Sequence, residues 1–226
     1  MNTKPFVYGL TKSDIINRIN LSLDIPSECA AKLIDNQVDV GLVPVAALKH
    51  IPNYEIISDY CIGATGAVNS VFIFSDKPIQ DIKTISLDSQ SRTSNSLALV
   101  LLKNYWKVSA EVVDQNAEAF VLIGDRTFVK KANYKFAYDL AEEWFNFTGL
   151  PFAFAVWAAN KPVSEEFIKE FNTALKFGLD NRLEVIKDCP LNGFDLKDYL
   201  QNKLDFDLDE SKRQAIKLFL GYIRAL

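Results

Sequence analysis

The most informative segment of the chain for chemistry is ISLDSQSRTSNSLALVLL, residues 85–102, in which an apolar run ends at Asp88 and a polar turn opens a helical pattern. The turn holds three hydroxyl side chains and one guanidinium, from Ser91, Arg92, Thr93 and Ser94. Unpaired amides at a helix start, the positive end of the helix dipole, hydroxyls and a guanidinium together suit a carboxylate. Plain capping of the helix by Ser91 or Thr93 is the alternative interpretation.

Two further turns carry glycines that let the backbone approach a ligand. In IGDRT, residues 123–127, a glycine, an acid and a base follow an apolar strand, and ligands gather at the carboxyl ends of strands in open α/β sheets. In the alternative interpretation Asp125 caps the next helix and Arg126 points to solvent. In GATGAVNSV, residues 63–71, two glycines lie close to Ser70, although glycines at a hinge would look the same.

The residue types that the chain lacks restrict its chemistry. His50 is the only histidine, and it ends a short helical pattern just before Ile51 and Pro52, which favours a surface or capping role. The sequence therefore predicts no Ser/His/Asp triad, no Cys/His pair and no metal cluster. We expect chemistry that needs neither a metal nor an organic cofactor.

Length and composition predict a folded globular protein that does not bind nucleic acid. The 226 residues, 49% of them hydrophobic, can bury a full core. With 25 basic and 29 acidic residues, the chain lacks the basic excess that nucleic-acid binding requires. It shows no signal-peptide run and no membrane-spanning stretch, and Cys29, Cys61 and Cys189 form no CxxC pair. These features favour buried reduced thiols and a soluble, cytoplasmic protein, and they leave the oligomeric state open.

The order of apolar patterns predicts an α/β fold. A first unit is expected as strand, helix and strand over residues 19–25, 26–36 and 38–45, which implies parallel pairing. The elements of a second α/β unit are expected at residues 84–88, 92–105, 110–114, 119–125 and 134–139, followed by a helix through Trp144.

Two long apolar segments flank the second unit. Residues 66–75 and 150–160 are each expected to run between two lobes as an extended strand, and together they would form a two-strand hinge. The remainder, from Ser164 to Leu226, has the pattern of three or four helices that pack back onto the first lobe.

Seven segments carry a pattern that is specific only when they are taken together. They are NTKPFVYGL (2–10), IPSECAAKL (25–33), VDVGLVPVAAL (38–48), DYCIGATGAVNSVFIFSDKPI (59–79), ISLDSQSRTS (85–94), IGD (123–125) and DLAEEWFNFTGLPFAFAVWA (139–158). In order and spacing they resemble the chorismate dehydratases of menaquinone biosynthesis, the MqnA type, over nearly the whole chain. The sister family, the dihydroxynaphthoate synthases, has a different N-terminal signature and a histidine at its site. The Asn-Thr-Lys-Pro-Phe signature and the poorly placed His50 therefore favour the dehydratases.

The resemblance implies the two-lobed fold of the type II periplasmic binding proteins, with the active site in the cleft between the lobes. Lobe 1 would comprise residues 1–68 and 158–226, and lobe 2 residues 69–157. Family members usually carry an apolar strand just before the asparagine of the signature, and this N-terminal strand is missing ahead of Asn2. We therefore expect the chain as given to be marginally stable or poorly active.

The resemblance also implies the reaction, which is loss of water from the dianion chorismate to give 3-[(1-carboxyvinyl)oxy]benzoate in the futalosine route to menaquinone. It implies Asn2, Arg92 and Asp125 as catalytic residues. The substrate-binding residues that it implies are Ser27, Gly66, Ala67, Val68, Ser70, Ser91, Thr93, Ser94 and Gly124. The proton acceptor is left open between an aspartate, Asp125 or Asp139, and the enolpyruvyl carboxylate of the substrate, with Asn2 orienting that group.

Other functions fit the same features. A non-catalytic binding protein for a small carboxylate would use the same lobes and the same anion-holding turns. The sister synthase and an inactive paralogue are the remaining alternatives. Turnover of chorismate separates all of them from the dehydratase.

Overall fold

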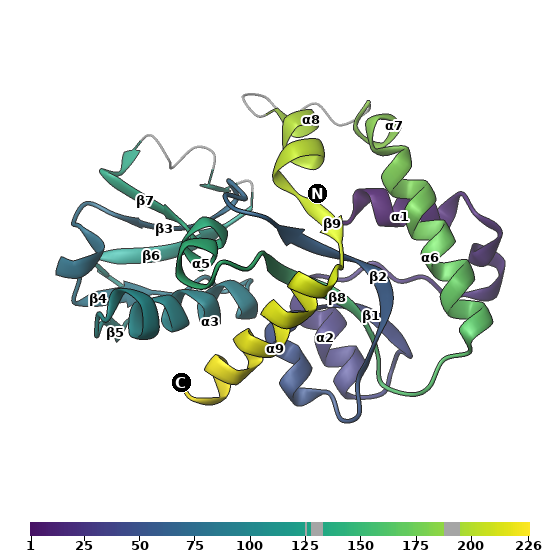
Figure 1. Ribbon diagram of the computed structural model, residues 1–226, viewed down its shortest axis with the longest axis horizontal. Helices are drawn as coiled ribbons and strands as arrows, with labels where there is room; N and C mark the ends of the chain where they lie inside the picture. Colours follow the sequence, from purple (N-terminus) through teal and green to yellow (C-terminus); the bar gives the residue numbers. More distant parts are fainter. Residues whose placement is uncertain (125, 128–132, 188–194) are drawn as a thin grey trace.

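Two β-sheets lie side by side in the computed structural model of the chain, which describes residues 1–124, 126–127, 133–187 and 195–226 (Figure 1). Four strands form the first sheet in the order β1-β8-β2-β9, and five form the second in the order β5-β4-β6-β3-β7. Helices flank both sheets, so the chain has the α/β architecture that the sequence predicts.

The first sheet is antiparallel throughout. Its strands are β1 (Val40–Pro44), β8 (Phe152–Ala159), β2 (Glu55–Ala64) and β9 (Asp205–Asp207). The helical segments connected to it are α1 (Lys4–Thr11), η1 (Asp14–Arg18), α2 (Pro26–Ile34), η2 (Val45–His50), α6 (Glu165–Asp180), α7 (Arg182–Ile186), α8 (Leu196–Asp198), η6 (Tyr199–Lys203) and α9 (Glu210–Arg224). Two helix starts are confirmed, because Pro26 lies in the first turn of α2 and the Ser164 side chain accepts from the Phe167 amide at 3.3 Å.

The second sheet combines parallel and antiparallel pairs. Its strands are β5 (Glu111–Val112), β4 (Thr84–Ser86), β6 (Ala119–Ile123), β3 (Val71–Ser75) and β7 (Phe136–Asp139). Its helical segments are η3 (Ile79–Asp81), α3 (Arg92–Val100), the π-helical η4 (Leu101–Trp106) and α5 (Leu140–Thr148). β4 pairs in parallel with β5 and β6, whereas β3 pairs antiparallel with β6 and β7. The second α/β unit predicted from the sequence is therefore confirmed.

The strand expected at residues 19–25 does not form, so this prediction is wrong. The segment leads from η1 into α2 without strand pairing, and Leu23 and Ile25 are 72% and 56% exposed. The physical reason is that an apolar run becomes a strand only beside a hydrogen-bonding neighbour. β1 pairs with β8 alone, in antiparallel fashion, so the parallel pairing expected for this first unit is wrong as well.

Two short links carry the chain between the sheets. Residues 65–70 join β2 to β3, and residues 149–151 join α5 to β8. Both predicted hinge segments therefore connect the sheets, although their strands begin only at Val71 and Phe152. β8 belongs to the first sheet from Phe152 onward, before the lobe boundary expected at residue 158, and the lobe boundaries themselves stay a prediction.

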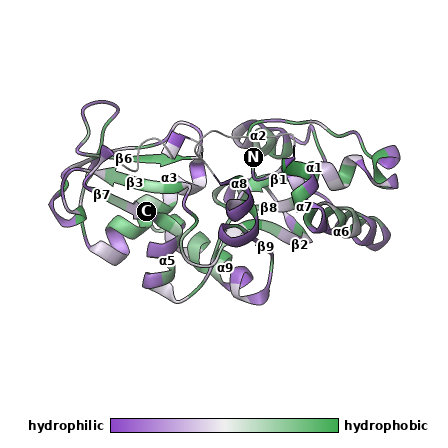
Figure 2. Cartoon of the chain, turned by 90° about the horizontal axis from the view of Figure 1, so that it is seen from above, coloured by the Kyte–Doolittle hydropathy of each residue, from purple (hydrophilic) through white to green (hydrophobic). Residues whose placement is uncertain are grey.

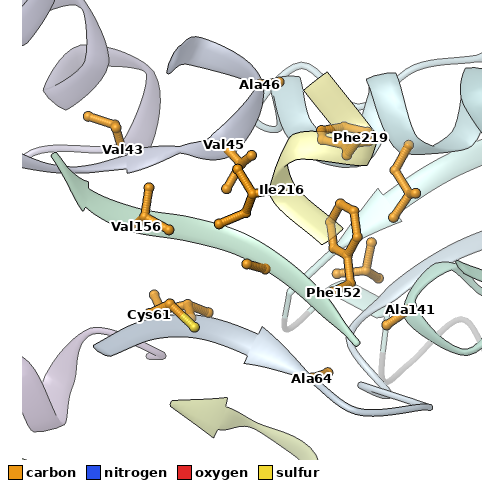
Figure 3. Packing of buried hydrophobic residues seen from close by; sticks show 14 of the residues in the cluster. Val43, Val45, Ala46, Cys61, Ala64, Ala141, Phe152, Val156, Ile216 and Phe219 are labelled. Carbon is orange, nitrogen blue, oxygen red and sulfur yellow. The ribbon is translucent and has the colours of Figure 1, made fainter. Parts of the chain in front are cut away.

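One continuous hydrophobic core runs beneath both sheets. Figure 2 shows hydrophobic residues concentrated in strands such as β3 and β6 and hydrophilic residues on α8. α9 packs between the sheets, where Phe219 lies close to Phe152 of β8 (Figure 3). The ring centroids of Phe219 and Phe152 are 5.1 Å apart, and those of Phe219 and Trp144 of α5 are 6.0 Å apart. All three rings are fully buried. This C-terminal helix therefore fixes the position of one sheet relative to the other.

Glycines bring α1 and α6 into backbone contact. A Cβ at Gly9 would lie 2.0 Å from the Ala174 carbonyl oxygen, and one at Gly178 would lie 1.9 Å from the Pro5 carbonyl oxygen. Neither position can therefore hold a larger residue without moving a helix. The contact fixes the start of α1, and with it Asn2, which lies in the turn just before that helix.

Candidate active site

The first turn of α3 contains the hydroxyl groups that the sequence assigns to anion binding. Ser91 is the N-cap residue, and its Oγ accepts from the Ser94 amide at 3.2 Å and donates to Ser94 Oγ at 2.8 Å. Thr93 is buried, and its Oγ1 accepts from the Ala46 amide of η2 at 3.1 Å. The capping role is therefore present for Ser91, and Thr93 ties α3 to the first sheet. The hydroxyl hydrogens of Thr93 and Ser94 stay available to an acceptor.

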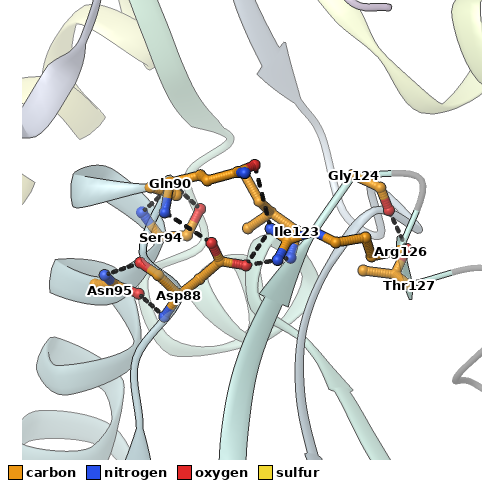
Figure 4. Close-up of polar contacts among 9 residues, drawn as sticks. Asp88, Gln90, Ser94, Asn95, Ile123, Gly124, Arg126 and Thr127 are labelled. Carbon is orange, nitrogen blue, oxygen red and sulfur yellow. Dashed lines mark hydrogen bonds and ion pairs between the residues drawn. The ribbon is translucent and has the colours of Figure 1, made fainter. Parts of the chain in front are cut away.

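Asp88 organises the two turns that follow β4 and β6. Its Oδ1 accepts from the Gln90 amide at 2.8 Å, while its Oδ2 accepts from the Ile123 amide at 3.2 Å and from Arg126 Nη2 at 2.6 Å (Figure 4). The Asp88 side chain is 0% exposed, and that of Arg126 is 46% exposed. Arg126 therefore pairs with a buried acid rather than pointing into solvent alone, which corrects the alternative interpretation of this turn.

Asn95 adds a second set of bonds to the same turn. Its side-chain oxygen accepts from the Asp88 amide at 2.9 Å, and its Nδ2 donates to the Asp88 carbonyl oxygen at 2.7 Å. With three bonds to the carboxylate and two to the main chain, Asp88 holds the start of α3 against the end of β6. These bonds provide the rigid support that a binding turn requires.

Hydrogen bonds connect three predicted site residues that are far apart in the sequence. Asn2 and Ser70 both contact Tyr199, and Gly124 bonds to the backbone of Ser70. The Tyr199 hydroxyl donates to Asn2 Oδ1 at 3.1 Å and lies 2.7 Å from Ser70 Oγ. The Gly124 amide donates to the Ser70 carbonyl oxygen at 2.8 Å. Hydrogen bonds therefore join the N-terminal turn, the first link between the sheets and the turn after β6.

The link at residues 65–70 is bent, and part of its backbone is already used. Gly66 has a φ of +81°, and no atom lies within 4 Å of the position its Cβ would occupy, so the backbone is open to a ligand there. The Asn69 amide, by contrast, donates to Asp139 Oδ2 at 2.6 Å. Hydrogen bonds among the described residues do not use the amides of Gly66 and Ala67. These two, more than Val68, are suited to hold a carboxylate.

Asp139 caps α5 from the end of β7. Its Oδ1 accepts from the amides of Ala141 and Glu142 at 3.0 and 3.3 Å. Burial raises the pKa of this carboxyl above its usual value, and the backbone bonds from Asn69 and Val68 oppose that rise. With these amides bound to its oxygens, Asp139 has a structural role, which was one of the two roles open to it.

Among the described residues, the side chains of Arg92 and Ser27 form no hydrogen bond with the other predicted site residues. Arg92 is exposed, and within the described part of the chain it forms neither a hydrogen bond nor an ion pair. Ser27 is half-buried in α2 and makes no contact with the other candidate residues through hydrogen bonds. Asp125 lies outside the described residues. Arg92 is thus the one predicted catalytic residue whose charged group has no protein partner in the described ranges.

Sequence reasoning missed Tyr199, and no motif in its neighbourhood could have revealed it. It lies in the C-terminal region, where the sequence shows only helical periodicity, and it is 3% exposed. Asp88 was recognised as the end of a strand, but its ion pair with Arg126 spans 38 positions and leaves no local signal. Both residues become visible only when the two sheets are assembled.

The remaining features of the molecule limit other kinds of site. Cavities of about 420 and 630 Å³ lie along α6 and β9, and no predicted site residue lines them. In the part of the chain that the structure describes, no three His, Cys, Asp or Glu side chains are grouped to bind a metal. A separate search of the same residues finds no helix both long and apolar enough to cross a membrane. His50 is exposed at the end of η2, as expected.

Known proteins are similar to this chain over most of its length. A family model described as "Menaquinone biosynthesis" matches residues 1–225. A chorismate dehydratase of Thermus thermophilus is 26% identical, over 86% of this chain and 83% of that protein.

The solved structures show the fold. A protein of Archaeoglobus fulgidus superposes with a TM-score of 0.70 at 17% identity, over 99% of this chain and 93% of that chain. The periplasmic aliphatic sulphonate binding protein of Escherichia coli does so with a TM-score of 0.52 at 11% identity, over 98% of this chain and 76% of that chain. The periplasmic-binding-protein type of fold predicted from the sequence is therefore confirmed.

Proposed function

Because the chain belongs to the family of menaquinone-biosynthesis proteins, we propose that it is a chorismate dehydratase. The proposed reaction removes water from chorismate and leaves 3-[(1-carboxyvinyl)oxy]benzoate, in the futalosine route. The observation that carries the proposal is the meeting of Asn2 and Ser70 on Tyr199, beside the turn that holds Gly124. This arrangement places polar groups from both sheets around one point, as an enzyme acting on a small dianion requires.

The chemistry begins at the ring carbon that bears the enolpyruvyl group. Loss of its proton sends electron density through the ring double bond toward the ring carboxylate. The hydroxyl then leaves from the neighbouring carbon, so that the proton and the hydroxide together make one water. The ring becomes aromatic, which drives the reaction forward. The protein must therefore stabilise negative charge on the ring carboxylate before the hydroxyl departs.

The first turn of α3 is proposed to hold that carboxylate. Arg92 can bind it in bidentate fashion, and the hydroxyls of Thr93 and Ser94 and the amides at the helix start can add donors. Donors aimed at developing charge are worth about 3 to 4 kcal/mol each in an enzyme site. Because Asp88 and Asn95 hold this turn in place, its donors need little reorganisation when charge develops.

The second carboxylate of chorismate is proposed to lie against the link between the sheets. The amides of Gly66 and Ala67 are suited to hold it, with Ser70 and Gly124 alongside. Asn2 would orient this enolpyruvyl carboxylate or assist departure of the hydroxyl. Ser27 is retained in the proposed site on the family resemblance alone.

The proton acceptor is proposed to be the enolpyruvyl carboxylate of the substrate. Asp139 is committed to the amides of α5 and the link, and Asp88 to Arg126 and two amides. Asp125 is the remaining aspartate candidate. A carboxylate carried by the substrate needs no protein base, and binding alone brings it close to the ring.

The decisive experiment is incubation of the purified chain with chorismate. A dehydratase produces a rising aromatic absorbance and a product that is lighter by one water in mass spectrometry. A non-catalytic binding protein would return chorismate unchanged, and so would the sister synthase. Unchanged chorismate would therefore refute the proposed function.

The same assay after dialysis against a chelator tests the expected independence from metal. We expect turnover to stay within error of the untreated protein, because elimination of water from chorismate involves no redox change and Arg92 supplies the positive charge. Loss of turnover that added zinc or magnesium restores would contradict this expectation.

A further inference from the structure

We propose that Tyr199 is a positioning residue whose hydroxyl orients the Asn2 amide in the active site. The inference rests on the proposed function for its activity readout. Tyr199 comes from η6, far from Asn2 and Ser70 in sequence, yet its hydroxyl contacts both side chains, Asn2 Oδ1 at 3.1 Å and Ser70 Oγ at 2.7 Å. It is 3% exposed, so water cannot easily replace either bond.

The number of hydrogens on the three groups fixes the direction of the bonds. A tyrosine hydroxyl carries one hydrogen, and Asn2 Oδ1 is an acceptor only. The hydrogen that Tyr199 gives to Asn2 cannot also serve Ser70, so the Ser70 hydroxyl donates to the Tyr199 oxygen. The bonds therefore run in one direction, from Ser70 through Tyr199 to Asn2.

This direction determines what each side chain offers to a ligand. With its oxygen held by Tyr199, Asn2 presents Nδ2 and its two hydrogens, and hydrogen bonds within the described ranges do not use that nitrogen. The hydroxyl hydrogen of Ser70 is used in the bond to Tyr199, so Ser70 offers only its oxygen lone pairs to a ligand. Asn2 is then the donor for a carboxylate or a departing hydroxyl. Ser70 is an acceptor only, so the carboxylate beside it is bound by the amides of Gly66 and Ala67 and not by the Ser70 hydroxyl.

The fold supports an orienting role at this point. Asn2 lies in a turn, and α1 behind it is fixed by the close contact with α6. Main-chain position alone does not choose between the two faces of an amide. When the Ser70 hydroxyl donates to the Tyr199 oxygen, the Tyr199 hydrogen is directed at Asn2 and selects the amide oxygen; the flipped amide would require Tyr199 to accept from Nδ2 and to donate to Ser70 instead.

The test compares turnover in four chains: wild type, Tyr199→Phe, Asn2→Ala and the double variant. Phenylalanine keeps the buried ring and removes only the hydroxyl. We expect Tyr199→Phe to lower kcat about tenfold, with KM within about twofold, since loss of one preorganised donor acts on the transition state. In the Asn2→Ala background the same change should alter kcat by less than about twofold, because the group that Tyr199 positions is gone.

Tyr138→Phe is the matched control. The Tyr138 hydroxyl accepts from the Ile79 amide at 2.9 Å in the second sheet, away from the residues of the site. The Tyr138→Phe variant also loses only a tyrosine hydroxyl that is partly buried, and its kcat should be unchanged. Equal kcat for Tyr199→Phe and wild type, or multiplicative effects in the double variant, would overturn the inference.

A Ser70→Ala arm tests the direction of the bonds. In the proposed direction, Tyr199 keeps its bond to Asn2 when Ser70 is lost, so the coupling of Tyr199→Phe with Asn2→Ala exceeds its coupling with Ser70→Ala. The reverse order would overturn the assignment.

A wild-type chain that leaves chorismate unchanged would instead refute the proposed function. The four chains are then compared by chemical unfolding, which does not depend on activity. Non-additive stabilities of Tyr199→Phe and Asn2→Ala support the contact, and additive stabilities refute it.

Discussion

Asp88 and Asp139 are two buried acids of the second sheet whose carboxylates bond to different kinds of partner. As whole residues they are 5% and 4% exposed. Asp88 follows β4 and Asp139 ends β7, and each holds a turn beside the candidate site. Asp88 has a cation, Arg126, at 2.6 Å, in addition to two amides. Among the described groups, only amides bond to Asp139, namely those of Val68, Asn69, Ala141 and Glu142.

The difference shows which charges of the site are available for chemistry. A buried carboxylate must be paired or hydrogen-bonded, and both aspartates satisfy this requirement inside the protein. Arg126 is used in the process, whereas Arg92 at the start of α3 is not paired to any described residue. This difference supports the proposal that Arg92 supplies the positive charge for a substrate carboxylate and that neither buried acid is the base.

The largest expected effect is that of Arg92→Ala. If Arg92 binds the ring carboxylate, its loss should lower chorismate turnover on the order of a hundredfold, while the melting temperature changes little because the side chain is exposed. Arg92→Lys should recover only part of the activity, since an ammonium cannot form the bidentate pair.

Arg18→Ala provides the control for this prediction. Arg18 is also a surface arginine, and it bonds Glu170 at 2.6 Å on the α6 side of the molecule. Its removal should leave turnover unchanged. Near-normal activity of Arg92→Ala would show that Arg92 does not bind the substrate. The difference between paired Arg126 and unpaired Arg92 would then have no functional meaning.

The second prediction concerns Asp88, the buried acid that is paired with a cation. Asp88→Asn keeps the shape of the side chain but removes the charge opposite Arg126, so it should lower the free energy of unfolding by about 2 kcal/mol, the value of a charge-assisted hydrogen bond. Because the turns after β4 and β6 would shift, turnover should fall on the order of tenfold. Urea unfolding and chorismate turnover measure the two effects. Unchanged stability would show that Asp88 does not organise these turns.

The sequence predicted the elements of the site better than their partners. The start of α3, the turn after β6 and the glycine-containing link were found because helix caps, glycines and apolar runs are local signals. Asn2 was found through the family resemblance. Tyr199 and the pairing of Arg126 with Asp88 depend on contacts between residues distant in sequence, which local patterns do not encode.

The strand expected at residues 19–25 failed for a related reason. Its alternation of apolar and polar residues fits a strand, but a strand also needs a neighbour, and β1 pairs only with β8. Helices make their own hydrogen bonds, so α2, α6 and α9 were predicted correctly.

The smallest expected effect is that of Asp139→Asn, the matched change in the acid without a cation. Asparagine can still accept from the amides of Ala141 and Glu142 but loses the bond from the Asn69 amide, so turnover should fall only about threefold, within the range of a lost neutral hydrogen bond. A collapse of turnover in a chain that remains folded would instead identify Asp139 as the proton acceptor and would refute the substrate-assisted proposal.

Wild type and Asp139→Asn should differ in how their stability depends on pH. Burial raises the pKa of Asp139 from its usual 3.8, so the protonated form is favoured in the folded state. The stability that this group contributes is therefore fully present below about pH 3.8 and is lost as the pH rises through the raised folded value. Asparagine does not titrate, so Asp139→Asn should gain stability relative to wild type as the pH rises from about 4 toward 7. Urea unfolding of both chains across that range measures the difference, and a difference that stays constant or falls with rising pH would show that burial does not govern this carboxyl.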